Sequence, residues 1–270
     1  MASCINCQTE TTTTHCPNCG QRMGVKRVTF KGIIQDFLSK WIGFDNQFGR
    51  TVLDMAINPG RVTDSYLKGN RTKYIGPLGF LVVMTALLII SFDVLGLEVQ
   101  DFIKTTQKEV QPFFQNDDIS PKQLEAQQKV QTAVNEFTAK YFRFFSVVII
   151  PFWAIVLGLF YRKEKLNYME TLVVTVYLSC EALWMNIIVL VIFKFTGSLY
   201  SIHALAISTI YYSYGLKKIF PNHNVIVSVF KTLSSLIGGF LLFMLFMLLV
   251  VFAFGITKVI QNPELIQQTG

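Results

Sequence analysis

Residues 239–256 read GFLLFMLFMLLVVFAFGI, an apolar stretch that contains no charged residue. An α-helix rises about 1.5 Å per residue, so a stretch of this length is typical of a helix that crosses the roughly 30 Å hydrocarbon core of a bilayer. The apolar pattern begins near Leu233 and places Lys231 at the bilayer surface, where its long side chain can reach water. The sequence therefore predicts a transmembrane helix over 233–256.

The composition of the whole chain indicates the same environment. Of 270 residues, 51% are apolar and 15% are charged, whereas roughly a quarter are charged in a soluble protein. A soluble domain of this size could not bury so much apolar surface. The apolar residues also occur in long blocks, which predicts an all-α polytopic membrane protein with about five transmembrane helices. The other expected spans are 75–97, 144–161, 171–193 and 198–216, within a membrane domain over 74–256.

Two of these spans contain unusual residues. Pro151 predicts a kink in the span 144–161, because proline cannot donate the backbone hydrogen bond of a helix. The span 198–216 is the most polar, but its mostly small residues fall on one face, which allows two helices to approach closely in lipid. That face consists of Ser201, Ala204, Ser208, Tyr211 and Gly215.

The basic residues predict the orientation of the spans. The net charge is +7, but the lysines and arginines cluster beside the spans, which is a topology signal and argues against nucleic-acid binding. The clusters at 22–73, 162–165 and 217–218 all fall on the cytoplasmic side if the N-terminus is cytoplasmic. Five spans then place the polar tail 257–270 outside, together with the loop 98–142, whose two amphipathic patterns predict a helical hairpin.

Two Cys-x-x-Cys pairs lie within residues 1–24, Cys4 with Cys7 and Cys16 with Cys19. Each pair can place two sulfurs on one tight turn, and two such turns supply a tetrahedral site for a metal ion. Four thiolates suit zinc and leave no open coordination position. The sequence therefore predicts a zinc ribbon whose metal is structural.

Two Cys-x-x-Cys pairs can also serve other chemistry. A disulfide needs an oxidising compartment, which a cytoplasmic N-terminus excludes, and a thioredoxin-like redox motif needs a strand–helix context that is missing. Iron in a rubredoxin-like site stays an alternative. Gly20 permits a backbone conformation that points amides at sulfur, and we expect His15 to be a neighbour of the site. Such a ribbon is either a docking module for a protein partner or a rigid N-terminal plug.

Amphipathic helices are expected over 25–73. Apolar residues recur at helical spacing over 33–42, with Thr29 as an N-cap, which is typical of a helix that lies in the membrane interface or packs against the ends of the spans. A second helix is broken by Pro59-Gly60, and Gly69 is the expected cap of a third.

Four short motifs follow one another within residues 1–80: Cys16-Pro17-Asn18-Cys19-Gly20-Gln21, Thr51-Val52-Leu53-Asp54, Asn58-Pro59-Gly60 and Tyr66-x-x-Gly69-x-Arg71-x-x-Tyr74-x-x-Pro77. Their order resembles the bacterial membrane family labelled domain of unknown function 3667. The resemblance implies the bacterial inner membrane and this architecture, but no activity, since none is established for the family. The five-span body is also similar, in topology alone, to the Yip1 membrane-trafficking family.

Glu181 lies near the middle of the span 171–193. A central acid costs about 3 kcal/mol on insertion, which the apolar residues of this span offset. Such residues typically mark ion or proton pathways, but a protonated carboxyl can also join helices by hydrogen bonds, with His203 as a conceivable partner. Basic residues that could contact a lipid phosphate or a bound anion, or simply anchor the positive side, are Arg61, Arg71 and Lys73.

No nucleotide-binding glycine motif, HExxH or GxSxG is present, and the cytoplasmic loops between spans are short, so we do not expect an enzyme. The leading interpretation is a membrane scaffold or assembly factor that recruits a protein partner through its ribbon. The alternative is a small transporter or channel that uses Glu181.

Overall fold

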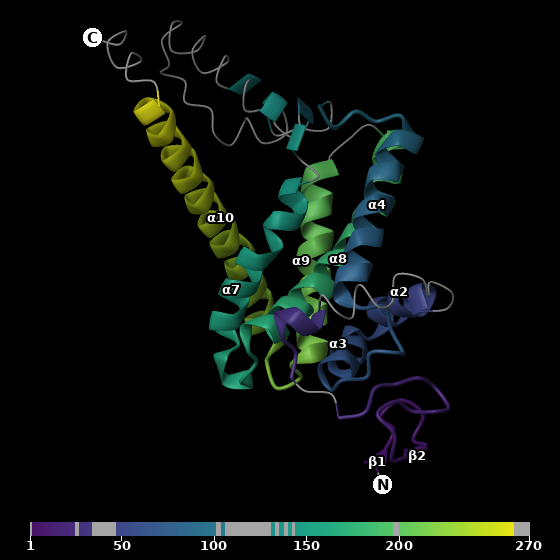
Figure 1. The fold of residues 1–270 in the computed structure, drawn as a ribbon. Helices are drawn as coiled ribbons and strands as arrows, with labels where there is room; N and C mark the ends of the chain where they lie inside the picture. The colour runs from purple at the N-terminus through teal and green to yellow at the C-terminus, as the bar shows by residue number, and fades with distance from the viewer. Residues whose placement is uncertain are drawn as a thin grey trace, which may run out of the picture.

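The protein is described here from a computed structural model, which has a mainly helical fold (Figure 1). The predicted amphipathic helix beyond residue 33, most of the loop 98–142 and the tail beyond residue 261 lie outside the described residues. The described residues are 2–24, 27–33, 47–100, 104–105, 131–132, 135–137, 140–141, 144–196 and 200–261, with backbone alone over 200–204 and 251–261.

Three of the described helices are long and apolar enough to cross a membrane: α4 (Pro77–Leu95), α8 (Tyr168–Thr196) and α10 (Val225–Gln261) over its Val225–Val250 part. A fourth apolar helix, Phe144–Phe160, is shorter. The more polar helix α9 (Tyr200–Ile219) is not among the membrane candidates. A helical protein with membrane-sized helices is therefore confirmed, whereas the number of five crossings stays a prediction.

The expected kink at Pro151 appears as a break in the helix. The helical residues 144–148 are followed by a turn at Ile149, and α7 (Ile150–Phe160) begins with Pro151 in its first turn. Proline is accepted at that position because its missing N–H would have no intrahelical partner there. A short 3-10 turn, η2 (Arg162–Glu164), then leads towards α8.

Helix α10 begins well before Leu233, the first residue of the predicted span. Lys231 is consequently part of the helix, and its ammonium lies 4.1 Å from the centroid of the Tyr161 ring at the end of α7. A cation above an aromatic face is stabilised by the negative potential of the ring. This contact joins the first turns of α10 to the C-terminal end of α7.

Helix α8 is the centre of the bundle and packs against α4, α7 and α9, while α10 packs against α7 and α9. In Figure 1 α10 diverges from α9 towards its C-terminal end. Glycines allow the closest approaches: a Cβ added to Gly215 would lie 2.3 Å from Cδ2 of Leu178, and one added to Gly239 would lie 2.9 Å from the backbone of Trp153. Close backbone contact of this kind is how helices associate in lipid.

Helices α2 (Gln47–Ile57) and α3 (Pro59–Leu67), with the connection 68–76, form a unit that we call the platform. It lies at the end of the bundle where the strands β1 and β2 are found (Figure 1). Tyrosine hydroxyls of α8 and α9 donate to backbone carbonyls of the platform and so attach it to the bundle. These hydrogen bonds are Tyr177 to Ile75 (2.7 Å), Tyr211 to Met55 (3.0 Å) and Tyr214 to Ile57.

The Asn58-Pro59-Gly60 motif joins α3 to α9. Asn58 is the N-cap of α3 and accepts a hydrogen bond from the Arg61 N–H, and Pro59 occupies the first turn. A Cβ on Gly60 would lie 2.5 Å from the carbonyl oxygen of Lys218 in α9. The expected helix break is therefore also a backbone contact that only glycine allows.

Candidate metal centre and its attachment to the platform

The four cysteines lie in a small ribbon at the N-terminus. Strands β1 (Ala2–Ser3) and β2 (Glu10–Thr11) pair in antiparallel register, with Ala2 opposite Thr11. An isolated bridge between His15 and Arg22 closes the second half of the ribbon. The two halves each present one Cys-x-x-Cys turn.

Both turns use the same backbone geometry. The N–H of Gln8 donates to the Cys4 carbonyl (2.8 Å), and the N–H of Gly20 donates to the Cys16 carbonyl (2.9 Å). Gln8 and Gly20 both adopt positive φ angles, 61° and 70°. Glycine adopts this conformation without the steric cost that other residues have, as expected for Gly20. Gln8 gives no such signal in the sequence.

The structure brings the four predicted cysteines together. The sulfurs of Cys4 and Cys19 are 3.6 Å apart, those of Cys7 and Cys16 are 3.5 Å apart, and all four lie within 4.8 Å of one another. Four sulfurs about 2.3 Å from one central ion would be separated by roughly 3.8 Å. The cluster therefore has the ligand atoms and the size to hold a single metal ion.

The thiols of the cluster differ in acidity. Hydrogen bonds with the Thr9 hydroxyl and N–H lower the pKa of Cys7 to about 6, whereas burial raises the pKa of Cys19 to about 11. The N–H of Cys7 helps to lower the pKa of Cys4. A bound cation favours the thiolate at every position, so it would offset the burial of Cys19. His15 contacts Thr14 and is not part of the cluster.

Two side chains, one buried and one half-buried, attach the ribbon to the platform. Gln21, which is 1% exposed, donates to the Gly69 carbonyl (2.7 Å), and its oxygen accepts from the Arg71 N–H (3.1 Å) and the Thr72 hydroxyl (3.0 Å). Asn6, inside the first Cys pair, accepts from the Asn70 side chain (3.1 Å). Each half of the ribbon therefore contributes one side chain that contacts the same stretch, residues 69–72.

That stretch is itself well ordered by local bonds. Gly69 has a φ of 95° and lies just beyond the end of α3, and the Asn70 N–H donates to the Ser65 carbonyl (2.9 Å). This is the glycine cap expected from the sequence. On the other side, the Gln47 side chain donates to the Thr72 carbonyl (2.6 Å). The ribbon is thus joined through this loop to both α2 and α3.

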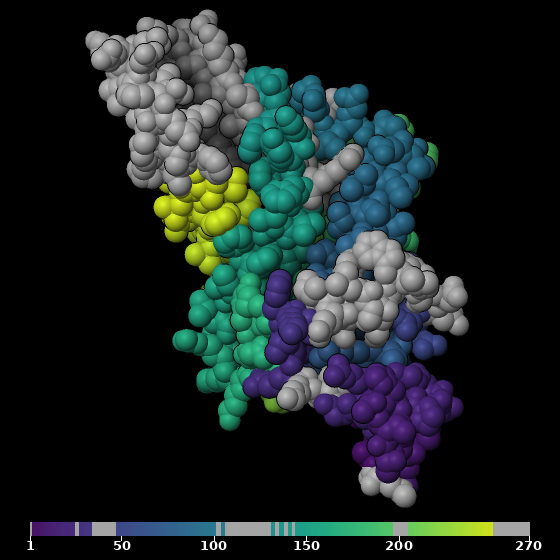
Figure 2. Space-filling view, viewed as in Figure 1, coloured from purple at the N-terminus to yellow at the C-terminus, as the bar shows by residue number. Residues whose placement is uncertain are grey.

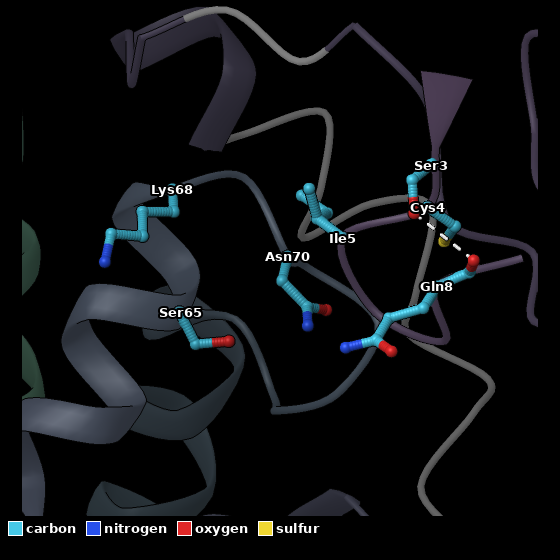
Figure 3. Close-up of a pocket in the computed structure, with 7 residues that line it drawn as sticks. All are labelled: Ser3, Cys4, Ile5, Gln8, Ser65, Lys68 and Asn70. Atoms are coloured by element: carbon cyan, nitrogen blue, oxygen red, sulfur yellow. Dashed lines mark hydrogen bonds between the residues drawn. The ribbon is translucent and has the colours of Figure 1, made fainter. Parts of the chain in front are cut away.

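A cavity of about 420 Å³ separates the ribbon from α3 (Figure 3). Ile5, which lines the cavity, is 53% exposed, and Lys68 is paired with Asp64 (2.6 Å). The ribbon extends beyond the platform as the purple surface in Figure 2. The residues lining the cavity are Ser3, Cys4, Ile5, Gln8, Ser65, Lys68 and Asn70.

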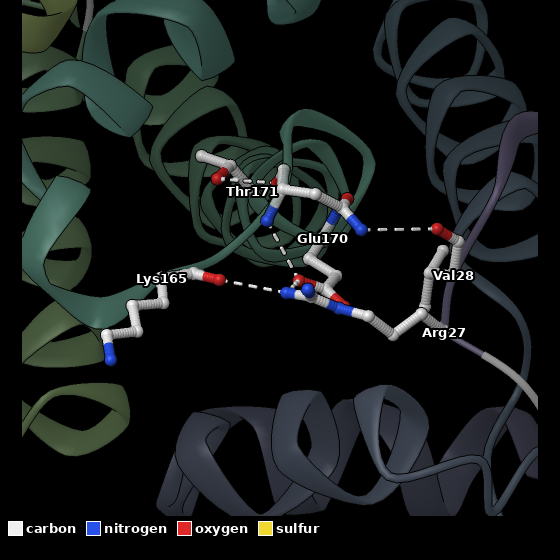
Figure 4. A network of polar contacts seen from close by, with 6 residues as sticks. Arg27, Val28, Lys165, Glu170 and Thr171 are labelled. Atoms are coloured by element: carbon white, nitrogen blue, oxygen red, sulfur yellow. Dashed lines mark hydrogen bonds and ion pairs between the residues drawn. The ribbon is translucent and has the colours of Figure 1, made fainter.

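A second attachment joins the segment after the ribbon to the start of α8 (Figure 4). Both oxygens of Glu170 accept from Arg27, each at 2.7 Å, and Arg27 also donates to the Lys165 carbonyl (2.8 Å). Glu170 and Asn167 form a reciprocal capping box, with backbone bonds of 2.9 and 2.8 Å. Sequence reasoning missed this site, although the Asn-x-x-Glu spacing before an apolar run was a usable signal.

Glu181 is fully buried in α8, and neither carboxylate oxygen has a hydrogen-bond partner in the part of the chain that the structure describes. Tyr177, one turn earlier, is also fully buried and faces α4 through its contact with Phe80. The suggested partner His203 lies in the first turns of α9, where only the backbone is described. The pairing of Glu181 with His203 therefore stays a prediction.

The basic residues singled out from the sequence all lie on the platform and contact other side chains. The Arg71 guanidinium is 5.4 Å from the Tyr66 ring centroid, and the Lys73 ammonium is 5.2 Å from that of Tyr74. Arg61 lies 4.0 Å from Asp54, whose carboxylate accepts from the Tyr74 hydroxyl (2.6 Å). Burial and this carboxylate raise the pKa of Tyr74 well above its usual value.

A family model described as protein of unknown function (DUF3667) matches residues 45–89. The predicted resemblance is thereby confirmed for the platform and most of α4, whereas the ribbon lies outside the matched residues. No curated protein and no solved structure matches the chain, and the comparisons give no support for the looser resemblance to the Yip1 family.

Proposed function

We propose that this chain is a non-enzymatic integral membrane scaffold or assembly factor of the bacterial inner membrane, which recruits a protein partner through a zinc ribbon. The observation that carries the proposal is the attachment of the ribbon by Asn6 and Gln21, one from each half, to residues 69–72. A ribbon held in this way offers a surface at a fixed position beside the spans. Its Ile5, which lines the cavity and is 53% exposed, is the apolar residue of the ribbon that we expect to contact the partner.

Zinc is proposed as the metal because four thiolates in a closed, nearly tetrahedral arrangement are a common structural zinc site. Such a site has no open position for substrate, which agrees with a structural role and with a function other than catalysis. Iron remains the chemical alternative, and metal analysis of the purified protein distinguishes the two.

Recruitment is tested by photo-crosslinking in intact cells. A photoreactive amino acid at Ile5 should give a discrete protein adduct, which disappears when Cys16 and Cys19 are both replaced by serine. The same amino acid at Ile237, an exposed apolar position on α10, is the matched control. No adduct at Ile5, or an adduct unchanged by loss of the ribbon cysteines, would refute recruitment through the ribbon.

The proposed topology has five spans with a cytoplasmic N-terminus and an external C-terminus. It is supported by the basic residues at the platform end and by the position of the far end of α10, opposite to that of the strands (Figure 1). A thiol reagent tests this topology on single cysteines placed in each region. A cysteine within 1–20 should be labelled from the cytoplasmic side, whereas cysteines within 110–120 and 262–270 should be labelled from the external side. Labelling of 262–270 from the same side as 1–20 would mean that α9 does not cross.

A transporter or channel is the second candidate, and the observation that favours it is Glu181. A buried carboxyl without a described partner is the residue type that typically binds protons or cations within membrane proteins. The purified protein in liposomes should then conduct protons or cations, and Glu181→Gln should abolish the flux without reducing the yield of folded protein. Equal flux in parent and variant, or none in either, would remove this candidate.

A further inference from the structure

The outer face of α2 is apolar although nothing described covers it. Leu53 and Ile57, four residues apart and so on one side of the helix, are 64% and 69% exposed. Thr51 and Met55, on the other side, are fully buried. Arg50 is exposed beside the apolar pair, three residues before Leu53. The helix therefore has one apolar face towards the core and a second one directed away from it.

The contacts of α2 place it at the level where the first span begins. The Phe48 ring is 6.1 Å from the ring of Phe80 in the first turn of α4, and the Thr51 hydroxyl accepts from the Ile75 N–H (3.1 Å). In Figure 1 the purple helical turn 30–33 lies at a similar level. Its Phe30 is 65% exposed, and Thr29 caps this turn as expected from the sequence.

The same end of the bundle carries basic side chains over tyrosine rings. The Lys73 ammonium lies 5.2 Å from the Tyr74 ring centroid, and the Lys218 ammonium lies 5.6 Å from that of Tyr214. Tyrosine and lysine are enriched where membrane proteins meet the headgroups, because the ring prefers the boundary and the cation prefers phosphate. Tyr214 also donates to the Ile57 carbonyl at the end of α2, and the Tyr74 hydroxyl donates to Asp54 (2.6 Å), so both pairs adjoin this helix.

The apolar face is small for a protein partner. The side chains of Leu53, Ile57 and Phe30 expose at most on the order of a few hundred Å², whereas a stable protein interface buries about 800 Å² on each side. Binding to a bilayer needs no minimum area, because each apolar side chain that enters it contributes its own favourable transfer free energy. The small size of the face and the position of α2 beside the start of α4 both favour lipid.

We propose that α2 is an in-plane membrane-interface helix. Leu53 and Ile57 enter the acyl-chain boundary of the leaflet in which α4 begins, and Arg50 and Lys73 contact the phosphates of anionic phospholipid headgroups. The part of the chain matched by the family model thus binds the lipid surface. This property is independent of ribbon recruitment.

The insertion of α2 is tested with an environment-sensitive fluorescent amino acid at Leu53 of the full chain in nanodiscs. The matched control carries it at Asp64 of α3, whose side chain is 57% exposed beside Lys68. Doxyl-labelled phosphatidylcholine should quench the Leu53 probe roughly twofold more than the Asp64 probe, and iodide should show the reverse order.

Two results would overturn the insertion. Equal iodide quenching at Leu53 and Asp64 would mean that α2 faces water. A Leu53 probe protected from both quenchers would mean that protein, from this chain or a second copy, covers the face.

The headgroup contact is tested with the Leu53 probe and a doxyl-labelled phosphatidylglycerol. In the parent, this anionic lipid should quench more than its zwitterionic counterpart at equal content. In an Arg50→Gln, Lys73→Gln double variant, the ratio of quenching by the phosphatidylglycerol to quenching by the phosphatidylcholine should approach one. Quenching by doxyl-phosphatidylcholine alone should stay as in the parent. A ratio of one in the parent, or an unchanged ratio in the variant, would refute the anionic-lipid contact.

Discussion

Gln21 and Glu181 are both buried polar side chains, but they differ in how many hydrogen bonds they make. Gln21 makes hydrogen bonds to the Arg22 and Gly69 carbonyls, the Arg71 N–H and the Thr72 hydroxyl, so its amide is fully used. Neither oxygen of Glu181 has a partner among the described residues.

This difference separates two kinds of structure within one chain. A buried polar group left without a partner costs about 1–3 kcal/mol, and satisfying it removes that cost. At the platform, polar bonds fix the position of the ribbon and of α2 and α3. In the middle of α8, apolar packing and the hydrogen bonds of other residues, such as Asn186 to Ser208 (3.2 Å), join it to its neighbours, and the described residues make no hydrogen bond to the Glu181 carboxyl.

The largest expected effect comes from removing the metal ligands. In a Cys16→Ser, Cys19→Ser double variant, the ribbon should lose metal binding worth about 10–16 kcal/mol and unfold, because so small a module has little core of its own. Elemental analysis should find about one zinc per chain in the parent and none in the variant. Equal zinc content in parent and variant would contradict the proposed zinc site. Iron in place of zinc in the parent would show that the site binds iron instead.

A smaller effect is expected where the platform meets the bundle. Gly60→Ala would place a methyl group 2.5 Å from the Lys218 carbonyl oxygen, and relieving a backbone clash typically costs about 1–3 kcal/mol. Gly49 in α2 has open space around its Cβ position, so Gly49→Ala should be neutral or stabilising by up to about 1 kcal/mol. Thermal unfolding in detergent measures both, and equal behaviour of the two variants would mean that α3 and α9 are not in close contact.

Gln21→Ala is expected to detach the ribbon from the platform without unfolding it. The variant leaves the Gly69 carbonyl and the Arg71 N–H without their partner, at a cost of about 1–3 kcal/mol. Hydrogen exchange at Arg71 should speed up while zinc content stays unchanged. Asn18→Ala, which removes one long bond to Thr9, is the control. Unchanged exchange at Arg71 in the Gln21 variant would mean that the ribbon is not held by this side chain.

Much of the architecture could be predicted because its signals are local. Membrane helices are recognised by runs of apolar residues, and the metal site by the spacing within each Cys pair. The cap at Gly69 and the break at Pro151 likewise depend on single residues whose backbone preferences are strong. Two of the predicted spans show the limit of local signals. The predicted fifth span corresponds to α10, which extends beyond the apolar run. The predicted fourth span corresponds to α9, which is too polar for its hydropathy to establish a crossing.

The attachments of the platform could not be predicted in the same way. Gln21 meets Gly69 and Arg27 meets Glu170 across 48 and 143 positions of sequence, and nothing in the local pattern encodes those pairings. Glu181 differs from these residues, because the sequence identifies it through the free-energy cost of placing an acid within a membrane span. Its role, however, depends on the side chains around it. The described surroundings offer no cation and no hydrogen-bond donor to its oxygens.

The smallest expected effect is that of Glu181→Gln, and it tests the comparison most directly. Under the scaffold proposal the carboxyl has no role in binding protons or cations, so an amide of nearly the same shape should change the free energy of unfolding by less than about 1 kcal/mol. Glu181→Leu should be about as stable as the parent, since it leaves no described partner unsatisfied.

Thermal unfolding of parent, Gln and Leu variants in the same detergent gives the answer. A large loss of stability in both variants would mean that the carboxyl has a partner after all, and the contrast with Gln21 would disappear. A clear gain in the Leu variant would mean that the parent keeps Glu181 at a cost to its stability. Such a cost is typical of residues retained for proton or cation binding, so that result would turn the argument from the scaffold towards the transporter.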